Sequence, residues 1–296
     1  MTQPSLPPPL LQPGRHAADE PRAAAAVLTA LGLGAAFAAP AVAVFLLLRG
    51  IAVFYQGAGG ALLDTAWFPG EGRLGVLPLL LGTLTTSALG LALAVPFGLL
   101  AAIWIRFYAG RRRGRLGEAV LGVMAGMPSV VFGLFGTFWI VPRLGPSLAS
   151  AGAVLAMMIV PSFALFALAA LRQVPDGLLR DGAALGLSRS AVIRRLALRV
   201  ARPGLIGAAT LALARALGEA LAVEMVAGNF PNLPTSLFDS VRTLTATLVQ
   251  EFEYAHGTHA AALHLIALAV VALAAALVGV AHRVANARPA QTPESA

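Results

Sequence analysis

Long apolar runs separated by short polar segments make up most of this chain. Each run is long enough to cross about 30 Å of hydrocarbon, which takes about 20 residues of α-helix. We predict six transmembrane helices, with approximate bounds Ala23 to Tyr55, Leu74 to Ile105, Glu118 to Val141, Ser147 to Leu171, Pro203 to Ala227 and Ala260 to Ala281. The pattern therefore indicates an all-α integral membrane protein.

Both ends of the chain are polar. Residues 1–22 are rich in proline and polar residues and show no helical period, which predicts a flexible tail. Residues 283–296 are a second tail by the same argument. Residues 23–282 then form one six-helix transmembrane domain, with a polar loop at about 172–202 between helices four and five.

The arginines predict how the helices are oriented. All 21 basic residues are arginine, and sixteen of them lie at the two ends and in the segments that follow helices two and four. The opposite side carries only Arg49, Arg73, Arg143 and Arg242. Because cytoplasmic segments are enriched in basic residues, we expect both termini on the cytoplasmic side.

Composition supports a membrane protein and removes several other classes. Of 296 residues, 58% are hydrophobic and 11% are charged, which lies outside the range of soluble domains. The chain has no cysteine, which excludes disulfides, thiolate metal sites and cysteine nucleophiles. It has no lysine, so it lacks the Walker A lysine of a P-loop ATPase. The net charge of +8 comes from arginines in the short segments between apolar runs, as membrane topology requires, and these arginines do not form one nucleic-acid-binding face.

The segment Leu171 to Gly204 is too polar to span a membrane but is regularly patterned. Its apolar residues alternate with arginines at helical spacing, which predicts short amphipathic helices at the membrane surface. These apolar positions are Leu178, Leu179, Leu185, Val192, Ile193 and Leu196. The pattern alone leaves two interpretations, a helix that rests on lipid and a helix that contacts a partner protein.

Helix five carries three charges, Arg215, Glu219 and Glu224, in an otherwise apolar span. Each costs at least about 2.5 to 3.5 kcal/mol at the bilayer centre, so such residues mark a pair or a pathway. On a regular helix Arg215 and Glu219 lie about 40° apart, and Glu224 lies about 180° from Arg215. Counted from Pro203, Arg215 is about 18 Å along the helix, near the bilayer centre, whereas Glu224 is near the outer interface.

Two interpretations of Arg215 and Glu219 remain, a mutually neutralising pair and a pathway. We favour the pathway, because two apolar residues would avoid the desolvation cost, and because Arg before Glu at this spacing supports a helix weakly. Hydroxyl groups in helices two and three either line the same path or bond to carbonyls of their own helices. They belong to Thr83, Thr85, Thr86, Ser87 and Ser129.

Two features on the outer side also carry alternatives. "HGTHAAALH" holds His256, His259 and His264, but no acid partner is evident beyond Glu253, so we predict interfacial histidines and no metal site. The loop 229–248, "NFPNLPTSLFDSVRTLTATL", has turn residues and apolar anchors. It fits either docking of a binding protein or a cap over the pore.

Several segments resemble the permeases of ABC importers and, among them, the PstC family of phosphate importers. The resemblance covers most of the chain from Trp67 to Ala281 and is carried by "WFPGEGRLGVLPLLLGTLTTS", "MAGMPSVVFGL", "ARALGEALAVEMVAGN" and "NLPTSLFDSVRTLTATL". It implies a type I ABC importer permease fold with cytoplasmic coupling helices between helices four and five. It also supports the hypothesis that Arg215 offers a bidentate site to a phosphate oxyanion. The second part of this hypothesis, which the resemblance supports less, is that Glu219 holds that arginine and accepts a proton from the substrate.

The loop resembles the Glu-Ala-Ala, three residues, Gly pattern by which these permeases contact their ATPase. Gly186 matches the glycine. The contact residues that the resemblance implies are Asp181, Ala183, Ala184, Gly186 and Arg189. Two positions depart from the family pattern, because Arg180 stands where glutamate is usual and Arg199 stands where proline is usual.

The resemblance implies partners and no catalysis in this chain. The expected partners are a PstA-like sister permease in a heterodimer, two cytoplasmic ATPase subunits that bind ATP and Mg²⁺, and a periplasmic phosphate-binding protein, in the lipid of a bacterial inner membrane. Neither a cofactor nor a metal is expected in the chain itself, and nucleic acid is not an expected partner. Three rival readings are a permease for sulfate, molybdate or another oxyanion, an ion-coupled secondary carrier with Glu219 as relay, and a structural scaffold.

Overall fold

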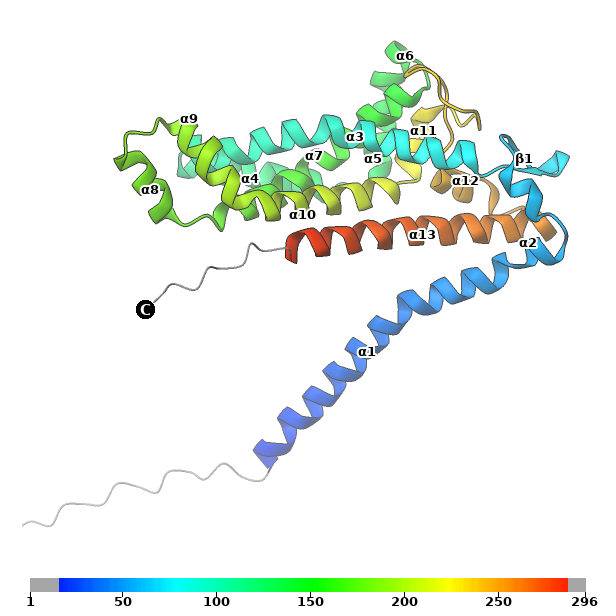
Figure 1. The fold of residues 1–296 in the computed structure, drawn as a ribbon, viewed down its shortest axis with the longest axis horizontal. Helices are drawn as coiled ribbons and strands as arrows, with labels where there is room; N and C mark the ends of the chain where they lie inside the picture. The colour runs from blue at the N-terminus through cyan, green and yellow to red at the C-terminus, as the bar shows by residue number, and fades with distance from the viewer. Residues whose placement is uncertain (1–15, 287–296) are drawn as a thin grey trace, which may run out of the picture. The chain divides into compact units, whose positions relative to one another are not determined.

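The described residues, 16–286 of this computed structural model, are almost entirely helical (Figure 1). The chain divides into two compact units, residues 1–48 and 49–296. In the first unit, α1 (His16–Gly50) exposes its large apolar residues, among them Leu28, Phe37 and Leu48. A helix that is apolar on every side suits contact with lipid. Residues 16–22, which composition assigned to the tail, belong to α1, and residues 1–15 lie outside the described range.

Four long helices form the body of the second unit. They are α3 (Leu77–Ile103), α7 (Leu148–Arg172), α10 (Leu198–Leu217) and α13 (Gly257–Asn286), and α10 contacts each of the other three (Figure 1). The central helix is α7, which is buried over most of its length. Glycines let α3 and α7 approach closely, because Gly90 faces Leu155 and Gly152 faces Leu89, with no room for a Cβ at either glycine.

Within residues 16–286, five helices are long and apolar enough to cross a membrane, and a bent pair adds a sixth span if it is counted as one. The pair is α4 (Arg111–Ala125) followed by α5 (Ser129–Phe135), which continues through a π-helical turn η4 (Gly136–Ile140) into α6 (Val141–Leu144). Its two halves meet at 92°. We predicted one helix from Glu118 to Val141; the structure starts seven residues earlier and bends at Gly126–Pro128, where Pro128 cannot donate a helical hydrogen bond.

The predicted fifth helix is also interrupted. It begins at Leu198, with Pro203 inside it, ends at Leu217, and resumes as α11 (Leu221–Ala227). The residues between, Gly218 to Ala220, do not continue the helix, and the carboxylate of Glu219 accepts the N–H of Ala222 in the first turn of α11 (3.1 Å). The predicted angles of Glu219 and Glu224 from Arg215 are therefore wrong, because they assumed one regular helix.

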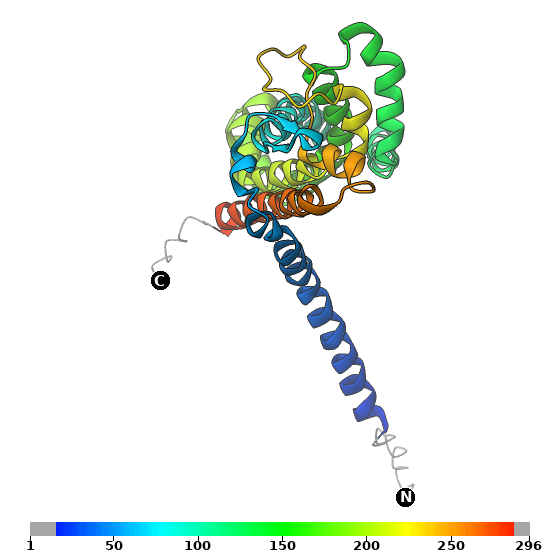
Figure 2. The ribbon, with the colours of Figure 1, turned by 90° about the vertical axis from the view of Figure 1, so that its right-hand side faces the viewer.

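One end of the second unit is built from short elements (Figure 2). A two-stranded antiparallel hairpin pairs β1 (Trp67–Phe68) with β2 (Arg73–Leu74), and Trp67 faces Leu74. The other short elements at this end are α2 (Ala52–Tyr55), the 3₁₀ turns η1 (Gly59–Leu63) and η2 (Pro69–Glu71), and α12 (Leu244–Glu251).

The opposite end of the second unit carries the polar loop (Figure 1). A π-helical turn, η3 (Trp104–Tyr108), follows α3 there. The loop itself folds as α8 (Asp176–Ala184), α9 (Arg189–Ala191) and a π-helical turn η5 (Val192–Ala197) that runs directly into α10. The prediction of short helices between helices four and five is confirmed in that form.

Candidate translocation path and coupling loop

Arg215 lies in the last turn of α10 and its side chain is exposed. It borders a hollow of about 270 Å³ between the end of α4, α7 and α10. The other lining residues are Ala125, Ser162, Leu165, Phe166, Leu211 and Ala212. Within residues 16–286, none of the ion pairs involves Arg215. A guanidinium in an apolar span is thus left open to whatever fills this hollow.

Glu219 is half-buried in the break between α10 and α11. Its side chain caps α11 through Ala222 and does not pair with Arg215. The structure therefore does not bring the two charges together as a mutually neutralising pair, and Glu219 does not hold the arginine in this conformation.

The two interrupted helices pack against one another beyond their breaks. Gly133 of α5 lies against Ala222 and Met225 of α11, and Gly136, one turn later, lies against Val226. The later glycine contacts the later residue of α11, so the two helices run in the same direction. Their first residues therefore lie at the same end of the pair. Ser129 starts α5 and is half-buried, which places its hydroxyl at the end where the chain leaves α10.

Thr83 bonds to backbone groups in this structure, which is one of the two alternatives that the sequence left open. Its side chain is only 2% exposed, and its hydroxyl donates to the carbonyl of Leu79 (2.8 Å) and accepts the N–H of Leu244 (2.9 Å). The hydroxyl thereby joins α3 to the start of α12. Thr85 likewise donates back to Leu81 within α3 (2.6 Å).

A buried polar cluster near the hairpin escaped sequence reasoning. Glu251 accepts hydrogen bonds from the indole N–H of Trp67 (2.9 Å), from Arg242 (2.7 Å) and, at 2.8 Å, bonds with Nε2 of His259. Arg242 also donates to Gln250, which in turn donates to Glu224 (3.2 Å). The six residues of this cluster come from β1, α11, the 242–251 segment and α13, so only their approach in space reveals it.

The three histidines differ in their surroundings and bonding partners. Across residues 16–286 no group of three potential metal-binding side chains converges. The acid that meets His259 is Glu251, not Glu253, and His264 bonds to the carbonyl of Ala260 (2.7 Å). His256 and Glu253 are exposed.

The outer loop between α11 and α12 is held by one carboxylate. Asp239 accepts the backbone N–H of Thr235, the hydroxyl of Thr235 and the N–H of Ser236, each at 2.8 Å. These donors hold the pKa of Asp239 below its ordinary value. The same loop exposes Phe230, Leu237 and Phe238.

The coupling loop exposes the residues that the resemblance singled out. Asp181, Ala183 and Ala184 are exposed on α8, and Gly186, with φ +81°, ends that helix in the left-handed conformation. Leu185, between them, is 84% exposed, although it is large and apolar. Gly182 is buried instead, because a Cβ there would meet Leu196 at 2.5 Å. The loop thus turns one face into the protein and leaves an apolar tip uncovered.

Several polar contacts fasten this loop to neighbouring helices. Arg106 in η3, the turn after α3, donates to Asp176 at the start of α8 (2.6 Å). Arg172, the last residue of α7 before the loop, forms a bidentate pair with Glu118 of α4 (2.8 and 2.6 Å). Arg189, which we predicted as an ATPase contact, donates to the carbonyl of Phe107 and lies over the ring of Tyr108. Arg180, at the family's glutamate position, is exposed.

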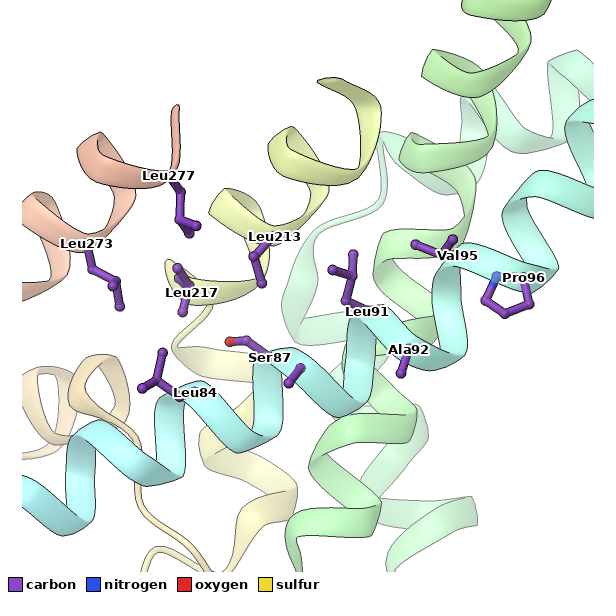
Figure 3. Close-up of a pocket in the computed structure, with 11 residues that line it drawn as sticks. Leu84, Ser87, Leu91, Ala92, Val95, Pro96, Leu213, Leu217, Leu273 and Leu277 are labelled. Atoms are coloured by element: carbon purple, nitrogen blue, oxygen red, sulfur yellow. The ribbon is translucent and has the colours of Figure 1, made fainter. Parts of the chain in front are cut away.

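A larger hollow lies between α3, α10 and α13, with a volume of about 580 Å³ (Figure 3). Leucines dominate its lining, and Ser87 supplies the polar side chain (Figure 3). It offers no cation to an oxyanion, so size alone does not mark the path.

Interrupted helices beside an unpaired arginine, together with an exposed helical loop at one end, define a membrane transport subunit. Residues 94–289 match the family described as binding-protein-dependent transport system inner membrane component, and the chain belongs to that family.

Curated relatives are similar over most of their length. A Probable ABC transporter permease protein YqgH of Bacillus subtilis is 33% identical over 75% of this chain and 76% of its own. A Phosphate transport system permease protein PstC of Mesorhizobium japonicum is 30% identical over 74% of this chain and 78% of its own. Among solved structures, an inward-facing MetNI methionine ABC transporter matches with TM-score 0.55 and 20% identity, over 72% of this chain and 94% of that one. The last similarity confirms the type I importer permease fold.

Proposed function

We propose that this chain is a path-forming permease subunit of an ATP-driven inorganic phosphate importer, equivalent to PstC. The observation that carries the proposal is the exposed, unpaired guanidinium of Arg215 beside the α10–α11 break. Several relatives named as phosphate permeases support the choice of substrate.

Arg215 is suited to a passing oxyanion. A guanidinium donates two parallel hydrogen bonds to a phosphate, which is a stronger arrangement than a point charge provides. Glu219 stands four residues on, in the break, where its carboxylate accepts a proton from a protonated phosphate. Fully ionised sulfate has no such proton to donate. Ser129 lies at the same end of the paired half-helices and adds a hydroxyl donor there.

The exposed face around Arg215 supports a second permease. An uncovered guanidinium near the bilayer centre costs at least about 2.5 to 3.5 kcal/mol in lipid, so a protein or a water-filled path must cover it. In the proposed assembly, a PstA-like sister subunit covers this face and encloses the path. A phosphate-binding protein delivers the substrate at the end that carries the hairpin and α12.

The apolar tip of the coupling loop supports contact with an ATPase. Ala183, Ala184 and Leu185 would enter a groove of the ATPase, whose subunits bind ATP and Mg²⁺. Motion of the loop would reach α3 through Arg106–Asp176 and α10 directly through η5. At the start of the loop, Arg172–Glu118 joins the end of α7 to α4. In this assignment the loop and both termini face the cytoplasm of a bacterial cell, as the arginine distribution predicts.

Uptake of labelled phosphate tests the proposal. Cells that lack their own high-affinity system would express the assembled complex with this chain, with Arg215→Gln, or with Arg283→Gln, an exposed arginine at the end of α13. We expect uptake that resists excess sulfate, falls at least tenfold in Arg215→Gln and is unchanged in Arg283→Gln. Normal uptake by Arg215→Gln at matched abundance would remove Arg215 from the path, and no uptake by a verified complex would point to another oxyanion.

A further inference from the structure

The break between α10 and α11 has a support outside its own helices. An interrupted helix frees backbone carbonyls that lipid cannot satisfy, so another part of the protein must bond to them. The hydroxyl of Thr245, in the first turn of α12, donates to the carbonyl of Glu219 at 2.6 Å. Thr245 is 6% exposed, which keeps this bond away from solvent.

The direction of the neighbouring hydrogen bonds follows from the single proton on each hydroxyl. Because Thr245 gives its proton to Glu219, Thr243 must be the donor in the contact of 3.2 Å between the two hydroxyls. The oxygen of Thr243 in turn accepts the N–H of Ala246 and caps α12. The three threonine and backbone bonds are therefore mutually compatible, and they hold Thr245 in one orientation.

The start of α12 is itself anchored on two sides. Thr83 of α3 accepts the N–H of Leu244, and Gly82 lies so close to the carbonyl of Arg242 that a Cβ would come within 2.3 Å of it. On the other side, Val241 donates to the carbonyl of Ala227 at the end of α11 (3.0 Å). The segment that precedes Thr245 is thus held by both α3 and α11, and the side chain of Thr245 reaches from it to the break.

We infer that Thr245 is a positioning residue for transport, which holds the backbone of Glu219 and thereby the α10–α11 break in register. The inference rests on the proposed function, because it assigns the break to the path. Removal of the hydroxyl leaves a buried carbonyl unsatisfied at the point where the path residues are set. Thr83, one of the hydroxyl residues that we considered for the path, acts indirectly, because it binds the N–H of Leu244, the residue before Thr245.

Matched substitutions separate this role from general packing. Thr245→Val keeps the shape of the side chain and removes the hydroxyl, whereas Thr245→Ser keeps the hydroxyl. Thr247→Val is the control, because Thr247 is equally buried in α12 but its hydroxyl donates to Thr243 within that helix (2.9 Å). We expect Thr245→Val to lower phosphate uptake about tenfold, and Thr245→Ser and Thr247→Val to stay within about twofold of the parent chain. Thr245→Ala serves as a second variant if Thr245→Val does not assemble.

Thiol labelling gives a readout that does not depend on transport. The chain has no cysteine, so Gly218→Cys introduces a unique thiol at the break, where an added Cβ meets atoms no nearer than 3.7 Å. In the whole complex, Thr245→Val should raise the rate of maleimide labelling at this cysteine several-fold, and Thr247→Val should not. Equal labelling rates in the two variants, or loss of uptake in Thr245→Ser, would overturn the inference. Faster labelling in Thr245→Val together with normal uptake by Arg215→Gln would leave Thr245 as the support of the break and refute only the proposed path.

Discussion

Arg106, in the turn after α3, and Asp176, at the start of α8, form an ion pair with 2.6 Å between Nη2 and Oδ1. This pair and the bond from Arg189 to Phe107 join the coupling loop to the end of a long helix. The loop is therefore attached to the end of α3 through side-chain contacts.

Reversing the charge at Asp176 should weaken coupling more than folding. Asp176 is largely exposed, so the pair contributes at most about 1 kcal/mol to stability and abundance should not change. We expect Asp176→Arg to lower phosphate uptake up to about fivefold and Arg106→Asp/Asp176→Arg to recover most of it. Arg283→Gln, at an exposed position outside this loop, is the control. Uptake that is unaffected by Asp176→Arg would show that the pair does not transmit the motion.

Gly82 should not tolerate alanine. A Cβ there would lie 2.3 Å from the carbonyl oxygen of Arg242, which is backbone and cannot rotate away. We expect Gly82→Ala to cost about 1–3 kcal/mol and to lower the thermal unfolding temperature of the purified complex. Gly122→Ala, where the added methyl group meets nothing within 4 Å, should be neutral. An unchanged unfolding temperature for Gly82→Ala would mean that the 241–245 segment is not packed on α3.

Glu251 should be needed because Arg242 is buried beside it. Their side chains are 8% and 14% exposed, and removing one partner of such a pair leaves an uncompensated charge. Glu251→Gln should destabilise the protein by about 3–5 kcal/mol, with a corresponding loss from the membrane.

The double variant Arg242→Met/Glu251→Met is the companion measurement. It removes both charges, so it should regain most of the abundance that Glu251→Gln loses. Abundance at the parent level for Glu251→Gln alone would contradict a structural role for the cluster, and quantitative immunoblotting of isolated membranes measures each case.

The hairpin should be stable to acid because of Asp64. The hydrogen bond from Arg73 lowers the pKa of the Asp64 carboxyl to about 2. A carboxyl whose folded pKa is lowered stabilises the fold above its unfolded pKa of about 3.9, and this contribution disappears as the pH falls towards about 2. In the parent chain, limited proteolysis of the 64–75 segment should therefore begin only below about pH 4. In Asp64→Asn, which lacks this carboxyl, the rate of cleavage should not rise at that pH. Cleavage that starts near neutral pH in the parent chain would contradict this assignment.

The sequence determined the class of the protein with little help from tertiary structure. Apolar runs of membrane-spanning length, sixteen arginines grouped on one side and an amphipathic loop follow from solvent preference alone. A preference for lipid or water is a property of each segment, so it can be read without knowing its neighbours. The exposed tip at Ala183, Ala184 and Leu185 did not follow from this reasoning, because solvent preference alone would cover Leu185.

Tertiary structure decided how the charges are used. Breaks at Pro128 and Gly218 interrupt two of the predicted helices, and the angular argument for the charges assumed an uninterrupted fifth helix. In the structure the side chain of Glu219 caps α11 and does not pair with Arg215. Thr83 and Thr245 acquired their bonding partners from segments more than twenty residues away in the chain. The Glu251 cluster likewise joins β1, α12 and α13. The physical reason is that a buried polar group is satisfied by whichever donor or acceptor packing brings within about 3 Å, and local sequence carries no record of that distance.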